Sequence, residues 1–243
     1  YDLVVGADGI HSATRTRLLG ERAPKIRYAG YTCWRIVVDS PFDDHDELIE
    51  MWGRGARIGF VPLTQNRVYA FLVKNAPPRG RDPEGESGAS LLRREFAMFG
   101  GPAETLLGGL RDEVIAMRHD VDELDGVAFG GGRVALVGDA AHAMTPNLGQ
   151  GAAQGIEDAL ALALSLRGAP DVPAAAAAYI ARRQKRAAAV QLQARRMGAM
   201  GQWENSLMCA LSNTLTRLAP TGATLKQVQA LLGPGVELAR GAG

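Results

Sequence analysis

The chain has 243 residues, enough for one large domain or two interleaved ones. Its hydrophobic fraction of 47% and charged fraction of 22% are ordinary for a folded globular protein and argue against disorder. Lys and Arg number 27 against 26 Asp and Glu, and this net charge of +1 gives no electrostatic reason to expect nucleic acid or an acidic membrane surface as a partner.

The chain opens on a strand and a short helix. Residues 2–6 (DLVVG) form an apolar run ending in glycine, which is typical of a strand buried on both faces of a parallel sheet. Asp8-Gly9 predicts a turn, and Ser12 is placed to cap the helix SATRTRLLG. Because the first residue is Tyr1 and not Met, we expect an upstream segment to be missing.

A different pattern follows, from about residue 26 to residue 74. The segments YTCWRIVV, ELIEMW, ARIGFVPL and RVYAFLVK are β-branched, aromatic and separated by turn residues, which predicts mostly antiparallel strands. Residues 76–90 are rich in Pro, Gly and charge, so we expect an exposed loop. Helices are expected over 91–100 and 102–109, and a polar strand within 118–127.

The buried-strand pattern returns in GGGRVALVGDA and is followed by a glycine-rich loop and a long helix that ends near residue 168. Residues 174–202 are alanine-rich and strongly helical, and a last helix is predicted from 206 to 218. The two strand–helix pieces, 1–20 and 128–168, are expected to share one sheet.

The loop after the second buried strand carries the clearest functional pattern. A helix N-terminus has free N–H groups and a partial positive charge, so it favours anions. Gly149, Gly151 and Gly155 would let a ligand or a neighbouring backbone approach closely, and Pro146 stiffens the loop. Asp139 ends the strand, where a carboxylate can accept hydrogen bonds from sugar hydroxyls. The residues alone leave another interpretation open, a capped turn with glycines that permit helix–sheet packing.

Two long motifs resemble one known family. GRVALVGDAAHAMTPNLGQGAAQGIEDALAL is similar, nearly residue for residue, to the second flavin-binding motif of the monooxygenases related to para-hydroxybenzoate hydroxylase, and YDLVVGADGIHSATR resembles their Asp-Gly motif. The order and separation of the motifs match, as do YTCWR and the later arginine-rich helix, so the resemblance covers nearly the whole chain.

The resemblance implies an α/β fold, in which part of a doubly wound, Rossmann-like FAD-binding domain is interrupted by a mixed or antiparallel β-sheet substrate domain and followed by C-terminal helices. The implied segments are 1–22 and 118–168 for FAD binding, 23–117 for the substrate domain, and 169–243 for the helical segment.

The resemblance also implies residue roles. Asp139 would hold the ribityl or ribose hydroxyls of FAD, and backbone N–H groups of the loop from Pro146 to Ala152 would face the N1–C2=O edge of the ring. Asp8 and Gly9 would lie near the pyrophosphate and the path of NAD(P)H, with Arg15 pairing with a carboxylate to support them. The implied cofactor-binding residues are Asp8, Gly9, Gly138, Asp139, Pro146, Asn147, Leu148, Gly149, Gln150, Gly151 and Ala152.

The implied reaction is FAD-dependent hydroxylation or epoxidation of an aromatic or olefinic small molecule with NAD(P)H and dioxygen, through a flavin C4a-hydroperoxide. The backbone at Pro146 would help to place the substrate. Tyr31, Trp34, Met51 and Phe60 are candidates for the pocket wall, with plain core packing as their alternative. Two other functions stay open, a flavin-dependent reductase or halogenase on the same scaffold and a non-catalytic fragment.

One departure concerns the ADP half of FAD, which the family binds with a βαβ unit carrying GxGxxG. The nearest match here, Gly130-Gly131-Gly132, precedes a strand and therefore predicts a turn. We expect these residues on their own to bind FAD weakly or not at all.

Other site classes find little support. Cys33 and Cys209 form no CxxC pair, which disfavours a disulfide framework and a zinc site and fits a reducing cytoplasm. There is no apolar run of about 18 residues for a membrane span, and no signal peptide opens the chain. We expect a cytoplasmic monomer or homodimer.

The histidines and the basic cluster are given structural roles. The histidines show no metal-ligand spacing, so no metal is expected; they are His11, His45, His119 and His142. The basic cluster lacks interleaved aromatics, so we predict a solvated helix face and no nucleic-acid partner; it comprises Arg182, Arg183, Lys185, Arg186, Arg195 and Arg196.

Overall fold

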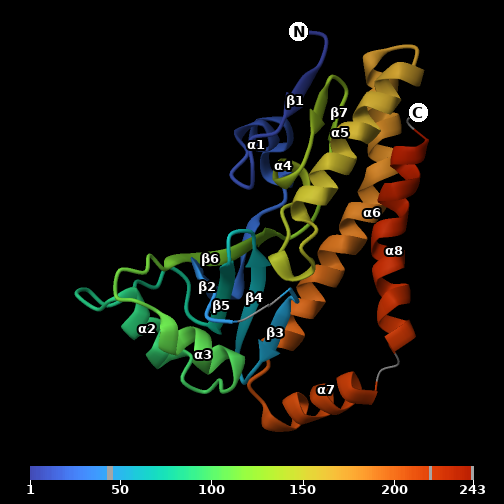
Figure 1. The fold of residues 1–243 in the computed structure, drawn as a ribbon. Coiled ribbons are helices and arrows are strands. Elements are labelled where there is room, and N and C mark those ends of the chain that lie inside the picture. Colours follow the sequence, from blue (N-terminus) through green and yellow to red (C-terminus); the bar gives the residue numbers. More distant parts are fainter. Residues whose placement is uncertain (43–45, 219–220, 242–243) are drawn as a thin grey trace. The chain divides into compact units, whose positions relative to one another are not determined.

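The computed structural model describes residues 1–42, 46–218 and 221–241 (Figure 1). The chain folds into two compact units, each built from segments far apart in the sequence. The first unit comprises Tyr1–Arg27, Asp122–Gly198 and Leu215–Gly243. The second unit comprises Tyr28–Val121 and Ala199–Thr214.

The first unit contains a three-stranded sheet in the order β1-β8-β7. β1 (Val4–Gly6) runs parallel to β8 (Val134–Leu136), with Val4 opposite Val134 and Gly6 opposite Leu136. This pairing confirms that the two predicted strand–helix pieces share one sheet. β7 (Gly130–Gly131) pairs with β8 in antiparallel fashion through a turn at Gly132, which has φ +62°, so the predicted glycine turn is also confirmed.

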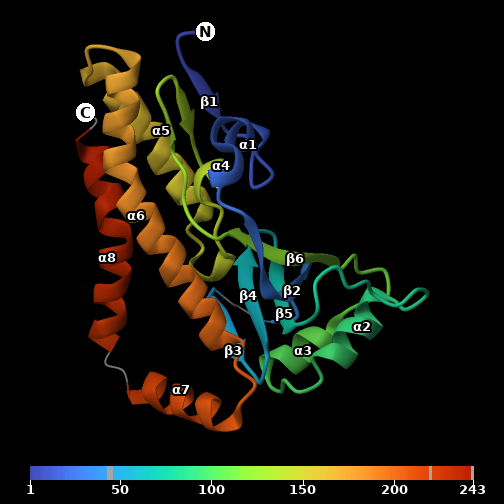
Figure 2. The same cartoon turned by 180° about the vertical axis from the view of Figure 1, so that it is seen from behind.

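Helices surround this sheet. The helices of the first unit are α1 (Ala13–Leu19), α4 (Asp139–His142), α5 (Gly151–Gly168), α6 (Val172–Gly201) and α8 (Thr221–Arg240). Ser12 caps α1 by accepting the N–H of Arg15 at 2.9 Å, as predicted. α5, α6 and α8 lie side by side (Figures 1 and 2). The local pattern predicted no separate helix here, but α8 lies within the C-terminal helical segment 169–243 that the resemblance implies, and it accommodates Pro234 in its interior.

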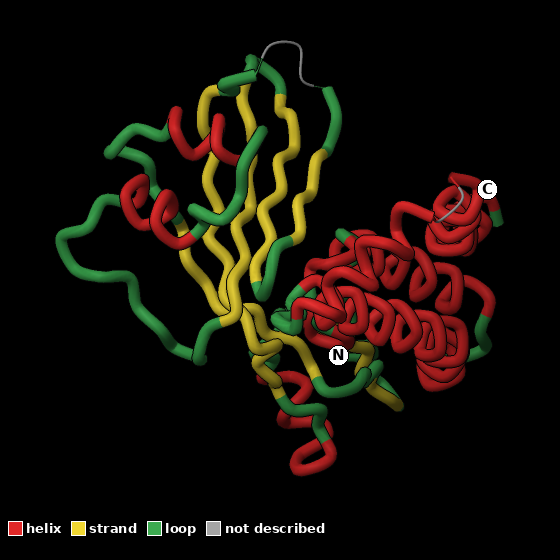
Figure 3. The backbone as a smooth tube through the Cα atoms, turned by 90° about the horizontal axis from the view of Figure 1, so that it is seen from below, coloured by secondary structure: helices red, strands yellow, loops and turns green. Residues whose placement is uncertain are grey.

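The second unit is built on a sheet whose strands are drawn in yellow in Figure 3. Its five strands follow the order β3-β4-β5-β2-β6. The strands are β2 (Ile26–Asp39), β3 (Ile49–Trp52), β4 (Ala56–Leu63), β5 (Arg67–Asn75) and β6 (Met117–Leu124). β2, β3, β4 and β5 pair in antiparallel fashion, as the alternation of strand and turn residues predicted. α7 (Ser206–Leu218) begins in this unit.

Two short helices cover one face of this sheet, α2 (Gly88–Glu95) and α3 (Pro102–Gly109). α2 begins earlier than predicted because Ser87 caps it by accepting the N–H of Ser90 at 3.2 Å, and it also ends earlier, at Glu95. Alternate residues of the strands, such as Ile36, Ile58 and Leu72, point at these helices and form the largest core.

The proposed pocket-wall residues divide between the two faces of the sheet. Trp34 and Phe60 are buried in the core under α2 and α3, and Met51 packs against that core. Trp34 donates its indole N–H to Asp82. Tyr31 belongs to a smaller core on the opposite face with Cys33, Val73 and Val121. For Trp34, Phe60 and Met51 this placement favours the core-packing alternative, because the helices fill the space in front of them.

Candidate functional site

The site begins where β8 ends. Gly138 has φ +57° and ψ −139°, a conformation that essentially only glycine adopts, so this turn requires a glycine. Asp139 follows as the first residue of α4 and is exposed. Within the described chain no group donates a hydrogen bond to its carboxylate. The carboxylate is therefore available to a ligand and is not used to cap the turn.

The next loop is held in shape by its own side chains. Pro146–Leu148 form a single 3-10 turn, and Gly149 then takes the left-handed conformation at φ +64°. Asn147 donates its side-chain N–H to Thr145 Oγ1 at 2.8 Å and to the carbonyl of Ala194 on α6 at 3.0 Å. The loop is thereby tied to a helix that comes much later in the sequence.

The N-terminus of α5 is open. Gln150 stands at its N-cap without a side-chain hydrogen bond to the helix, so the first N–H groups lack that partner. A Cβ added at Gly149 or Gly151 would meet nothing within 4 Å. A planar ligand can therefore approach this backbone closely, at the positive end of the helix dipole.

The third glycine of the loop motif has a packing role. A Cβ at Gly155 would lie 3.5 Å from the Cα of Gly138, so α5 and the strand end pack backbone to backbone here. The sequence left two interpretations open, close approach of a ligand and close packing of the helix on the sheet. Gly155 serves packing, whereas Gly149 and Gly151 face open space and leave room for a ligand.

The Asp8 turn is occupied by its own hydrogen bonds. One oxygen of the Asp8 carboxylate accepts the Ser12 hydroxyl at 2.5 Å, and the other accepts the N–H and hydroxyl of Thr14 at 3.0 and 2.9 Å. These bonds, that from Ser12 foremost, lower the pKa of Asp8 from 3.8 to about 2. Gly9 beside it has φ +75°. Asp8 therefore organises the start of α1, whatever else it binds.

Arg15 was predicted to support the Asp8 turn by pairing with a carboxylate, but it supports this turn through backbone carbonyls instead. Its side chain is buried, and it donates to two backbone carbonyls, that of Ile10 at 2.6 Å and that of Ala140 at 2.9 Å. Arg15 thereby joins the Asp8 turn to α4. Carbonyls at the ends of short elements need donors, and a long guanidinium can supply several at once.

The basic cluster on α6 is not uniformly solvated, which corrects the prediction. Arg183 is 2% exposed and bonds Asp158 and Glu157 of α5. Arg186 also pairs with Glu157, and Arg195 pairs with the buried Glu123. These arginines bind α6 to the rest of the first unit and so are not spare charges for nucleic acid.

Two polar residues behind the site, Asp158 and His142, are fully buried. A structural role was predicted for His142, and no role was predicted for Asp158. The pattern of α5 contained a hint, since Asp158 lies one turn from Gln154 and from Leu162 on the same buried face. A carboxylate at such a position requires a partner.

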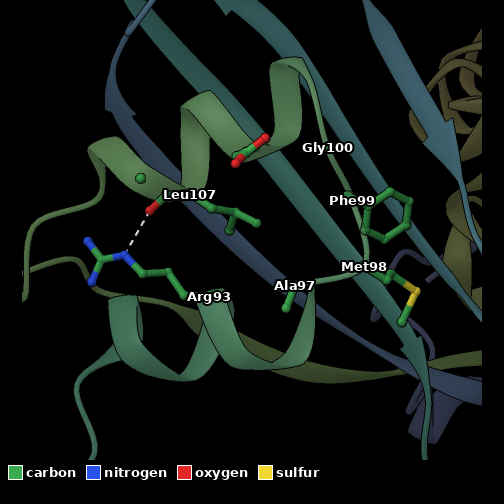
Figure 4. A pocket seen from close by; sticks show the side chains of 8 residues that line it. Arg93, Ala97, Met98, Phe99, Gly100 and Leu107 are labelled. Atoms are coloured by element: carbon green, nitrogen blue, oxygen red, sulfur yellow. Dashed lines mark hydrogen bonds between the residues drawn. The ribbon is translucent and has the colours of Figure 1, made fainter.

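A hollow of about 460 Å³ lies between α2 and α3 in the second unit (Figure 4). Arg93 reaches across it and donates to the carbonyls of Leu107 and Leu110. Met98 and Phe99 line its other side. Arg93, the charged donor in this hollow, is already bonded to carbonyls near the end of α3. None of the predicted site residues lines the hollow.

The described residues hold no group of three His, Cys, Asp or Glu side chains arranged to bind a metal ion; His45 lies outside them. Within the same part of the chain, no helix combines the length and apolarity that crossing a membrane requires.

Comparison with known proteins decides the family. Residues 2–194 match the family described as FAD binding domain. The chain belongs to this family. Its open turn fits the cofactor, with a free carboxylate at Asp139 and a glycine cradle before α5 that a Cβ would fill. The resemblance inferred from the two motifs and the mixed α/β fold class are thus confirmed.

Several relatives are FAD-dependent enzymes or monooxygenases by name. Aurachin C monooxygenase/isomerase of Stigmatella aurantiaca is 42% identical over 219 residues, covering 89% of this chain and 56% of the relative. 2-Heptyl-3-hydroxy-4(1H)-quinolone synthase of Pseudomonas aeruginosa is 37% identical over 235 residues, covering 94% of this chain and 59% of the relative. This member of the FAD binding domain family therefore spans less than two thirds of the length of these relatives.

A solved structure of the family has the same fold. Klebsiella pneumoniae HpxO complexed with FAD and uric acid superposes with a TM-score of 0.86 at 29% identity, covering 96% of this chain and 60% of that one.

Proposed function

We propose that the protein is an FAD-dependent monooxygenase that hydroxylates an aromatic or olefinic small molecule with NAD(P)H and dioxygen. Two features of the same loop carry the proposal, in a chain of the FAD binding domain family. The carboxylate of Asp139 has no hydrogen-bond partner among the described residues, and the N-terminus of α5 at residues 149–151 is open to a ligand. FAD, when bound, supplies the redox chemistry. The protein's share is binding, orientation and charge.

Each group at the turn has a role in this proposal. Asp139 accepts hydrogen bonds from cofactor hydroxyls, and the first N–H groups of α5 stabilise negative charge on the ring. Asn147 fixes the loop by its bonds to Thr145 and Ala194. Pro146 and Gly149 fix its backbone, so the loop offers its N–H groups in one arrangement. Asp8 and Gly9 stay proposed neighbours of the pyrophosphate. The backbone of Leu148, Gln150 and Ala152 is proposed to complete the binding site of the flavin ring.

For the substrate we propose the sheet face that α2 and α3 leave uncovered. Tyr69 and Phe71 lie half-buried on it, their ring centroids 6.2 Å apart. Arg35 beside them donates from Nε to Nε2 of His119 at 2.8 Å and from one terminal nitrogen to the Tyr69 hydroxyl. Burial first, and then the charge of Arg35, lower the pKa of His119, so its ring stays neutral and accepts.

Two of the three Arg35 nitrogens are thus fixed, and the third has no partner among the described residues. A pre-oriented cation beside two aromatic rings suits a planar ligand with an acidic or carbonyl oxygen. Two named ligands or products of relatives, a quinolone and uric acid, are nitrogen heterocycles that carry oxygen substituents on the ring. We therefore propose a fused nitrogen heterocycle as the substrate class; Tyr31 stays a candidate on this face.

The reaction is tested by incubating the full-length protein with FAD, NADH or NADPH and a panel of quinolones, purines and benzoates under air. Oxygen-dependent oxidation of NAD(P)H that yields a product heavier by one oxygen atom supports the proposal. Substrate reduction without oxygen would indicate a reductase, and halide-dependent product a halogenase. No flavin binding at all would favour a non-catalytic module.

The substrate face has its own variant. Arg35→Gln is expected to raise KM for an oxygen-bearing heterocycle on the order of tenfold, because one charge-assisted hydrogen bond is worth about 1.5–3 kcal/mol. Arg118→Gln is the matched control, since Arg118 pairs with Asp82 and stacks over Trp34 on the covered face. An equal effect of both variants would contradict this placement. A cytoplasmic monomer or homodimer stays part of the proposal.

A further inference from the structure

A single carboxylate lies behind the turn that links β8 to α4. Asp158 on α5 is fully buried, and its Oδ2 accepts the backbone N–H of Gly138 at 2.8 Å. The same oxygen lies 2.6 Å from Nε2 of His142 at the end of α4. Its other oxygen, Oδ1, accepts Nε of Arg183 on α6 at 2.7 Å. One side chain therefore contacts three elements of the first unit.

The charge of this carboxylate is compensated. A buried ion is costly unless it is paired and its remaining acceptor sites are filled. Arg183 pairs with Asp158 and also donates to the carbonyl and side-chain oxygens of Gln154 at 3.1 and 2.8 Å. The other carboxylate oxygen lies within hydrogen-bond distance of both the Gly138 N–H and Nε2 of His142. Asp158 is thus fixed in position through both of its oxygens.

The bond to Gly138 has a specific consequence for the turn. Gly138 adopts its conformation at φ +57° without a steric penalty, but a glycine can also leave it easily. Its N–H points to Asp158, which holds the peptide in one orientation. The next residue is Asp139, whose carboxylate faces solvent with no partner in the described chain. The direction of Asp139 therefore depends on Asp158.

We infer that Asp158, fixed by Arg183, is a positioning residue for the cofactor: it sets the Gly138–Asp139 turn so that Asp139 and the start of α5 present their groups to FAD together. This inference rests on the proposed function, since it takes FAD as the ligand of the turn. The buried ion pair of Asp158 and Arg183 thereby has a role in cofactor binding as well as in packing.

The test compares Asp158→Asn with Leu162→Ala in the full-length protein. Asn has nearly the same shape but no charge, so Arg183 keeps only Glu157 as an ion-pair partner and the Gly138 N–H has a weaker acceptor. Leu162 lies one turn further along α5 in the hydrophobic core of the first unit, and its truncation lowers stability without touching the turn. If Asp158→Asn does not fold, Arg183→Lys replaces it, because it retains the charge and loses the fork of donors.

Two quantities are measured below the unfolding temperature of each variant: hydrogen exchange of the Gly138 amide without FAD, and the Kd for FAD by quenching of flavin fluorescence. We expect Asp158→Asn to lose amide protection and to raise Kd on the order of tenfold, the loss of one buried hydrogen bond to a charge. Leu162→Ala should leave both values near those of the wild type.

The outcomes separate the two hypotheses. An unchanged Kd in Asp158→Asn, or an equal rise in Leu162→Ala, would overturn the positioning role. A wild-type protein that binds no FAD would contradict the proposed function instead, and the amide comparison would still decide whether Asp158 fixes the turn.

Discussion

At the scale of single residues, the open glycines of the loop are the sharpest probe of ligand approach. Gly149 has a positive φ, so a β-branched residue there strains the backbone by roughly 1–3 kcal/mol whether or not a ligand is present. Gly151 starts α5 with open space at its Cβ and no such restriction. A substitution at Gly151 can therefore block a ligand without destabilising the fold, whereas a substitution at Gly149 would do both.

We therefore predict that Gly151→Val weakens FAD binding at least tenfold and leaves the melting temperature nearly unchanged, because its side chain occupies space that only the ligand would use. Titration of flavin fluorescence and thermal unfolding measure the two effects. Gly149→Val, the comparison variant, should reduce both. Full flavin content in Gly151→Val would contradict the placement of the ring.

Asp8 gives a prediction in pH. Its pKa is lowered to about 2 in the folded state, so its hydrogen bonds stabilise the fold above pH 3.8 and this contribution is lost as the pH falls toward 2. Since the group is exposed, Asp8→Ala should cost only about 1 kcal/mol at neutral pH. The difference in unfolding free energy between wild type and variant, from urea titrations, should shrink across that acid range; a constant difference would argue against the assignment.

At the scale of elements, the uncovered sheet face depends on one small residue. Gly59 on β4 stands opposite Phe71 on β5, and a Cβ there would lie 2.1 Å from the Phe71 ring. Gly59→Ala must therefore displace that ring, at a cost of about 1–3 kcal/mol. Phe71→Leu should restore much of the loss in the double variant, which a double-mutant cycle by urea unfolding would detect. Additive effects would contradict the contact.

At the scale of the whole molecule, the 243 residues contain the turn for the flavin ring but no GxGxxG unit. Expressed alone, they are expected to bind FAD weakly or not at all, because the pyrophosphate would lack its cradle of N–H groups. Flavin absorbance of the purified 243-residue chain measures this. Stoichiometric flavin would contradict the prediction.

Local patterns in the sequence were sufficient for most of the elements and for the family, but not for α8 or for the bounds of α2. The apolar runs before Gly6 and Gly138 indicated parallel strands, and alternation indicated the antiparallel sheet, because both depend on side chains a few residues apart. The motif from residue 132 to residue 162 indicates the turn that we propose for the ligand, for the same reason. What the sequence alone determined is therefore the type and order of most strands and helices and the family.

The tertiary structure decided which polar groups are buried and which sheet face is covered. Arg183 has the local sequence of a solvated helix, yet it is buried because Asp158 lies opposite, 25 positions earlier. Arg15 serves a carbonyl 125 positions away, and Trp34 and Phe60 lie beneath helices that follow them in the chain. Burial of a charge depends on partners distant in sequence, and periodicity does not record them.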